Sequence, residues 1–171
     1  MRYLAYGSNM SSARIAERLG RCEFVGSARV EGYRLAFHKR GHDGSGKCDA
    51  CRSEDDAIMY GVVFELSHEQ AQQLDGFEGP NYERRILKVS IDGCTSEAYA
   101  YIALPSAVDF TLRPYPWYRA FVLDGALLNR LPAGYVDFIR RYPTIPDPDA
   151  MRQAANEKIL EKRGRCRIHC G

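Results

Sequence analysis

The order in which strand and helix signals follow one another constrains the fold of this chain most strongly. Up to residue 104 the sequence consists mainly of short runs of strand-forming residues, and after Pro105 helical periodicity prevails. Strands followed by helices predict an α+β fold. With 171 residues, 45% of them hydrophobic, the chain is long enough to bury one core. We expect strands at 2–6, 24–30, 33–38, 57–66, 82–91 and 97–104, and helices at 117–131, 134–142 and 148–163.

Turn residues predict how neighbouring strands pair. The runs 24–30 and 33–38 are close in sequence and are expected to pair with each other. The runs 82–91 and 97–104 flank Asp92-Gly93, a dipeptide typical of tight hairpin turns, so they should form an antiparallel hairpin. The predicted α+β fold therefore contains at least one hairpin between strands that are neighbours in sequence.

Two connecting segments have distinct local signals. Ser67 and Gln70 have the spacing of a capping box, which predicts a short helix that ends near residues 74–76 and is followed by a turn at 77–80. Residues 39–56 are rich in Gly, Asp, Ser and Cys. Their composition and length predict a surface loop or a lid.

The cysteine content and the lengths of the apolar runs indicate the cellular compartment in which the chain is expected. The longest apolar run, 98–104, is far shorter than the roughly 20 residues that cross a bilayer, and residues 1–6 are too short for a secretory signal. We therefore expect a cytoplasmic chain with no membrane partner, whose thiols stay reduced because its core needs no disulfides. The six cysteines are Cys22, Cys48, Cys51, Cys94, Cys166 and Cys170.

The formal net charge of +2 is distributed unevenly. From Arg152 to the end there are six Lys or Arg against two Glu, which leaves a small negative charge on the rest of the chain. The body is therefore not a nucleic-acid surface, and we interpret the basic end as solvated. No nucleic-acid partner is expected.

The first strand runs through Tyr6, Gly7, Ser8 and Asn9 directly into the start of a helix that Ser11 or Ser12 can cap. Backbone N–H groups at such a point are unpaired, and a glycine allows a ligand to approach them, so the loop can hold a carboxylate or an oxyanion. The alternative is that these residues only make the turn and cap the helix.

Glu78 is an isolated charge in an otherwise uncharged segment between Phe77 and Gly79-Pro80. Apolar neighbours would raise the pKa of its carboxyl group and allow it to accept and return a proton near neutral pH. A solvated turn glutamate is the alternative. The residues by themselves do not choose between the two.

The pair Cys48 and Cys51 suggests a zinc site, which would need ligands from the C-terminal tail. Structural zinc sites hold four ligands, and here the tail would have to fold back against the loop to supply them. We expect no metal, and we interpret His38 and His42 as solvated because they lack the helix and glutamate of a metalloprotease motif. The tail's candidate ligands are Cys166, His169 and Cys170.

Two motifs occur together in this sequence. The first is the run 3–10 (YLAYGSNM) at the N-terminus, and the second is 74–79 (LDGFEG), followed by Tyr82. In this order they closely resemble the γ-glutamylcyclotransferase family, whose members open with such an aromatic-x-A-Y-G-S-N segment. The resemblance extends through the helix that begins with Pro116-Trp117-Tyr118-Arg119 and covers roughly residues 1 to 131.

The resemblance implies a mixed, partly closed β-barrel with surrounding helices. It also implies that the α-amine of an L-γ-glutamyl group attacks its own γ-amide carbonyl, which gives 5-oxoproline and a free amine or amino acid without a cofactor. Glu78 would be the catalytic acid and base. The residues expected to bind the substrate are Tyr3, Leu4, Ala5, Tyr6, Gly7, Ser8, Asn9 and Tyr118.

Three further expectations follow from the resemblance. The spacing from Glu78 to Tyr82 differs from that of vertebrate relatives, so Tyr82 is not expected to contact the substrate. Asn9 points away from relatives specific for glutathione or γ-glutamylamines. We divide the chain into a cyclotransferase-like domain at 1–142 and a basic helical extension at 143–171, in a monomer or a homodimer. A non-catalytic module that binds a small carboxylate or amine is the alternative function.

Overall fold

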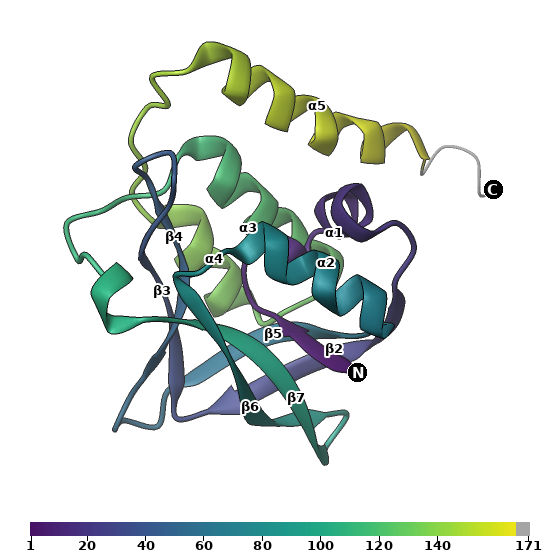
Figure 1. The fold of residues 1–171 in the computed structure, drawn as a ribbon. Helices are drawn as coiled ribbons and strands as arrows, with labels where there is room; N and C mark the ends of the chain where they lie inside the picture. Colours follow the sequence, from purple (N-terminus) through teal and green to yellow (C-terminus); the bar gives the residue numbers. More distant parts are fainter. Residues whose placement is uncertain (167–171) are drawn as a thin grey trace.

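The computed structural model describes residues 1–166, with side chains through Glu161. Figure 1 shows the arrangement of the elements, which are α-helices, strands and two short 3₁₀ helices (η1 and η2). In chain order they are β1 (Arg2–Ala5), η1 (Ser8–Met10), α1 (Ser12–Leu19), β2 (Glu23–Glu31), β3 (Tyr33–Arg40), β4 (Gly46–Arg52), β5 (Ile58–Glu65), α2 (His68–Glu78), β6 (Tyr82–Ile91), β7 (Cys94–Ala103), η2 (Pro105–Ala107), α3 (Pro116–Leu128), α4 (Ala133–Arg141) and α5 (Ala150–Cys166).

Five strands form a closed barrel in the order β1-β5-β2-β6-β7. Neighbouring strands are antiparallel except β1 and β7, which pair in parallel where Tyr3 lies opposite Tyr99. The expected α+β fold with a mixed β-barrel and surrounding helices is therefore confirmed, and the barrel is fully closed. Closure removes the free strand edges that an open sheet would expose.

The local signals around α2 and the last two strands lead to the predicted elements, with one change. β6 and β7 form the expected hairpin, and Asp92 and Gly93 have φ values of 49° and 81° at its turn. The capping box at Ser67 starts α2. However, α2 continues to Glu78 and ends at Gly79, whose φ is 73°. Glu78 is thus held by a helix and does not lie in a turn.

Two expectations about residues 24–56 are wrong. β2 pairs with β5 and β6 in the barrel, whereas β3 pairs with β4 in a separate two-stranded sheet, so β2 and β3 do not pair with each other. The predicted loop at 39–56 contains β4. Four of the seven residues of β4 are buried, including Cys48 and Asp49, and Cys48 forms part of the wall of a cavity.

The helices gather at one end of the barrel (Figure 1). α3 packs against η1 and α4, and α5 lies across α1 and α3. The indole N–H of Trp117 on α3 donates a hydrogen bond to Asp147, which also binds Arg152 on α5 and so fixes the outer helix to the body. No helix in the described part of the chain is long and apolar enough to span a membrane.

Candidate active site

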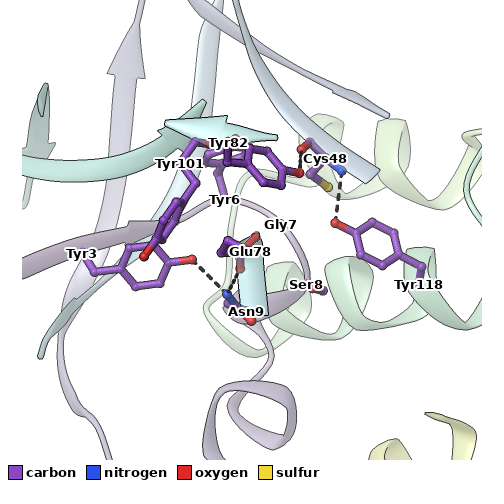
Figure 2. A pocket seen from close by; sticks show the side chains of 10 residues that line it. All are labelled: Tyr3, Tyr6, Gly7, Ser8, Asn9, Cys48, Glu78, Tyr82, Tyr101 and Tyr118. Atoms are coloured by element: carbon purple, nitrogen blue, oxygen red, sulfur yellow. Dashed lines mark hydrogen bonds between the residues drawn. The ribbon is translucent and has the colours of Figure 1, made fainter. Parts of the chain in front are cut away.

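A small cavity lies where the chain leaves β1 and meets the end of α2 (Figure 2). Its volume is about 30 Å³. The residues that line it come from the N-terminal strand and loop, from α2 and α3, and from β4, β6 and β7. They are Tyr3, Tyr6, Gly7, Ser8, Asn9, Cys48, Glu78, Tyr82, Tyr101 and Tyr118.

Glu78 directs its carboxylate toward the N-terminal loop (Figure 2). Its Oε1 accepts hydrogen bonds from Nδ2 of Asn9 at 2.9 Å and from the guanidinium of Arg18 at 3.0 Å. The side chains of Glu78 and Arg18 are only 16% and 13% exposed, so water screens this ion pair weakly. Among the described residues no donor contacts Oε2, which leaves this oxygen available to a substrate proton.

The surroundings of Glu78 differ from the apolar setting that the sequence suggested. Phe77 is 48% exposed and lies against the guanidinium of Arg18, 5.1 Å from it, so it does not cover the carboxylate. Asn9 and Arg18 are also bonded to each other at 3.0 Å, and Asn9 donates to the hydroxyl of Tyr3 at 3.0 Å. A polar network therefore orients the carboxylate.

The loop after β1 forms η1, whose first bond runs from the N–H of Met10 to the carbonyl of Gly7 at 3.0 Å. The N–H groups of Ser8 and Asn9 precede this bond and have no acceptor within the short helix. These two groups can therefore donate to a ligand, which is one of the two alternatives that the sequence left open. Gly7 has a φ of −114°, and a Cβ there would lie 3.0 Å from Cβ of Cys48, so close packing against β4 explains this glycine.

Two tyrosines hold the backbone of Cys48 at the cavity wall. The N–H of Cys48 donates to the hydroxyl of Tyr118 at 3.0 Å, and the hydroxyl of Tyr82 donates to the carbonyl of Cys48 at 2.5 Å. Burial raises the pKa of Tyr82 and Tyr118 well above the usual value, so both stay protonated. Burial also raises the pKa of the Cys48 thiol, which makes it a poor nucleophile.

Most of the predicted site residues meet in this cavity. Tyr3, Tyr6, Gly7, Ser8, Asn9, Glu78 and Tyr118 all line it. Leu4 and Ala5 do not, because they are fully buried in the barrel wall, where β1 pairs with β5.

Sequence reasoning missed several residues of the cavity. Cys48 belonged to a predicted loop, and Tyr82 was expected to lie away from the substrate, although its ring lines the wall. Tyr101 follows Tyr99 at the two-residue period of a strand, which was the only local signal for it. Arg18 reaches Glu78 only because α1 and α2 pack together, and no sequence motif indicates that contact.

A second, outer cavity of about 210 Å³ shares part of its lining with the inner one, namely Ser8, Glu78, Tyr82 and Tyr118. Cationic side chains predominate in the rest of its wall. Arg18 is paired with Glu78, and Lys47 with Asp43 at 2.7 Å. The cations that line it are Arg14, Arg18, Lys39 and Lys47, and its acids are Asp43 and Glu78.

Lys39 is the cation of this outer cavity with the least compensation. It is 3% exposed and lies 4.4 Å above the ring of Tyr82, and it forms no ion pair within the described residues. Burial lowers the pKa of Lys39, while the negative charges of Glu78 and Asp43 act against that shift. The outer cavity therefore presents positive charge that an anionic group can neutralise.

The four cysteines whose side chains are described, Cys22, Cys48, Cys51 and Cys94, are free thiols as expected. Cys48 and Cys51 are an odd number of positions apart on β4, so they face opposite sides of the strand. They therefore cannot bind one zinc ion together, which was the alternative that the sequence suggested. The other ligands of that alternative lie outside the described residues: the Cys166 side chain, His169 and Cys170.

His38, which the sequence suggested to be solvated, is only 6% exposed. Its Nε2 lies 2.9 Å from Asp49 and 3.2 Å from Cys51. His42 is exposed, as expected, and borders the outer cavity.

Comparisons with known proteins identify a family and a shared fold. A family model described as "Gamma-glutamyl cyclotransferase, AIG2-like" matches residues 3–119. A solved structure named "Gamma-glutamyl cyclotransferase" is similar with a TM-score of 0.81 and 22% identity, over 92% of this chain and 98% of that one. The uncharacterized protein loc79017 from Homo sapiens is similar with a TM-score of 0.77 and 22% identity, over 91% and 97% of the two chains.

YkqA from Bacillus subtilis has a TM-score of 0.68 at 21% identity, and the similarity covers 85% of this chain but 56% of that protein. At these identities the structural matches show a shared fold. No curated protein matches this chain in sequence.

Proposed function

This chain belongs to the AIG2-like gamma-glutamyl cyclotransferase family, and from that premise we propose that it releases 5-oxoproline from L-γ-glutamyl compounds. The observation that carries the proposal is the position of Glu78. Its carboxylate lies in the cavity that Ser8 and Asn9 also line, with one oxygen free of protein donors among the described residues.

The reaction needs a proton shuttle. The α-nitrogen of the γ-glutamyl group forms a bond to the γ-carbonyl carbon, and the bond from that carbon to the leaving nitrogen breaks. The attacking nitrogen loses one proton and the leaving nitrogen gains one, so a single carboxylate beside both can carry it. Glu78 performs this step through Oε2, while Asn9 and Arg18 hold Oε1 in place.

Negative charge develops on the carbonyl oxygen during the attack. The N–H groups of Ser8 and Asn9 stabilise it without rearrangement, because η1 already holds them in position. Nucleophile and electrophile belong to one molecule, so a cavity that keeps the glutamyl chain curled supplies much of the remaining rate. The neutral hydroxyls of Tyr3 and Tyr118 complete the wall around it.

The inner cavity of about 30 Å³ has room only for the reacting atoms, so the rest of the substrate, including the acceptor half, extends into the outer cavity of about 210 Å³. The excess of positive charge there favours an acceptor that carries a carboxylate, such as the amino acid of a γ-glutamyl dipeptide. A cationic acceptor such as lysine would face Lys39 and Arg14 unfavourably.

Incubation with matched γ-glutamyl substrates tests both parts of the proposal. We expect 5-oxoproline from γ-glutamyl amino acids, and lower kcat/KM for a γ-glutamyl alkylamine of the same size. Binding of γ-glutamyl compounds without 5-oxoproline would refute the enzyme and support the non-catalytic binding module. Equal kcat/KM for both substrates would refute only the role of the outer cavity.

A further inference from the structure

Three potential metal ligands meet on the two-stranded sheet, separate from the residues that line the inner cavity. They are His38 on β3 and Asp49 and Cys51 on β4, and their ligand atoms all lie within 4.8 Å of one another. The His38 Nε2 is 2.9 Å from Oδ2 of Asp49 and 3.2 Å from Sγ of Cys51, and Sγ is 3.8 Å from the same Oδ2. His38 and Asp49 are buried, and Cys51 is half-buried.

Hydrogen bonds alone satisfy this cluster poorly. An imidazole nitrogen carries either one proton or one lone pair, directed along a single line in the ring plane. It therefore cannot form good bonds to the carboxylate and to the thiol at the same time, although both are at contact distance. A single cation between the three ligand atoms can coordinate all three at once.

We propose that His38, Asp49 and Cys51 form a binding site for one divalent transition-metal ion of the zinc type. Zinc is bound by histidine nitrogen, thiolate sulfur and carboxylate oxygen at about 2.0 to 2.3 Å, which places neighbouring ligand atoms roughly 3.2 to 3.7 Å apart in a tetrahedral site. The separations of 2.9, 3.2 and 3.8 Å differ from these values by a few tenths of an ångström.

The neighbours of the cluster prepare it for a cation. The other oxygen of Asp49 accepts a hydrogen bond from the backbone N–H of Ala103 at 2.8 Å, which fixes the carboxylate in the way that outer contacts fix metal ligands. Without a metal, burial and Asp49 raise the pKa of the Cys51 thiol to about 11. Arg34 beside the sulfur favours the thiolate, and binding of the ion releases the thiol proton.

The ion would join β3 to β4 one residue away from the inner cavity. Cys48 precedes Asp49 on β4, and its backbone is held by Tyr82 and Tyr118. Strands are rigid supports for a metal site. With three protein ligands, water would hold the fourth position of the ion. A bound ion would therefore stabilise the sheet that carries Cys48 and Lys39, and we assign it no part in the cyclisation chemistry.

Cobalt(II) titration of tag-free protein tests the site, because a thiolate bound to cobalt gives a near-ultraviolet charge-transfer band. We expect one equivalent to bind with this band, and zinc to displace it and raise the melting temperature. Cys51→Ser should abolish the band, and His38→Gln should weaken binding by roughly 10- to 100-fold or more. Cys94→Ser, an exposed cysteine, is the matched control and should bind as the wild type does.

Melting temperatures without metal show whether each variant is folded, and Cys51→Ser is the decisive variant because its side chain is only half-buried. A wild-type protein that binds no cobalt at micromolar concentrations would overturn the proposal. A charge-transfer band that persists in Cys51→Ser would also overturn it. Loss of the band in Cys48→Ser, with wild-type melting, would assign the ion to the other cysteine and refute this ligand set.

Discussion

Replacing Glu78 by Gln separates proton transfer from substrate binding at this site. The amide keeps one oxygen that can accept from Asn9 and Arg18, so the contacts at 2.9 and 3.0 Å survive with a neutral acceptor in place of the carboxylate. The amide is not basic, and it replaces the oxygen that faces the substrate. Loss of a general acid and base costs about 10² to 10⁴ in kcat, which corresponds to about 3 to 5 kcal/mol of transition-state stabilisation.

The same change has a smaller effect on folding. Hydrogen bonds to charged groups contribute about 1.5 to 3 kcal/mol and neutral ones about 0.5 to 1.5 kcal/mol, so two weakened bonds should lower the free energy of unfolding by about 2 kcal/mol. For a chain of this size that lowers Tm by several degrees. The variant should therefore be folded, bind substrate with an unchanged Kd and release almost no 5-oxoproline.

The assay compares 5-oxoproline release at saturating substrate with calorimetric binding of the same substrate. Glu31→Gln is the matched control, because Glu31 is also ion-paired, with Arg29 at 2.8 Å, but lies on the surface of β2. It should leave kcat unchanged, because Glu31 lines neither cavity. Turnover of Glu78→Gln within a few-fold of the wild type would refute Glu78 as the proton shuttle.

The remaining predictions concern the two cavities. Gly7→Ala places a Cβ 3.0 Å from Cβ of Cys48, whose backbone is clamped, so the loop must move and kcat/KM should fall by roughly 100-fold, whereas Gly134→Ala meets no neighbour and should be neutral. A lower Tm with a normal kcat/KM in Gly7→Ala would show that the loop after β1 has only a structural role. Lys39→Met should raise KM about tenfold for γ-glutamyl amino acids and not for the alkylamine, with exposed Lys88→Met as control. Because burial lowers the pKa of Lys39, this preference should weaken as pH rises toward the usual lysine pKa, and a constant preference would contradict the assignment.

Local rules predicted the elements whose cause is local. The capping box at Ser67 and the turn at Asp92-Gly93 both depend on residues a few positions apart. The inner cavity was largely predictable for a similar reason, since one short run, 3–9, supplies half of its lining. Glu78 was identified correctly as a cavity residue, although its helix is longer than predicted.

The errors arose where distant segments decide the structure. Polar composition made 39–56 resemble a loop, but the residues of β4 are polar because Asp49 and Cys51 contact His38 across the sheet. Strand propensity does not indicate which strands pair with each other. The sequence therefore predicted that β2 pairs with β3, its neighbour along the chain, whereas β2 pairs with β5 and β6. The contact of Arg18 with Glu78 likewise requires the packing of α1 on α2.

The two halves of the proposed site lie on different parts of the fold, and this separation affects which acceptor the protein prefers. The groups proposed to act on the γ-glutamyl half lie on the N-terminal loop and α2, where sequence motifs are readable. Lys39 and Lys47, which line the outer cavity proposed for the acceptor half, lie on β3 and β4, whose pairing is separate from the barrel. A change of charge on this two-stranded sheet can therefore alter the preferred acceptor without disturbing Glu78 or the barrel. Exchanging Lys39 and Lys47 for neutral residues should shift preference toward γ-glutamyl amines while 5-oxoproline formation continues, and loss of turnover on every substrate would show that the two halves of the site are not independent.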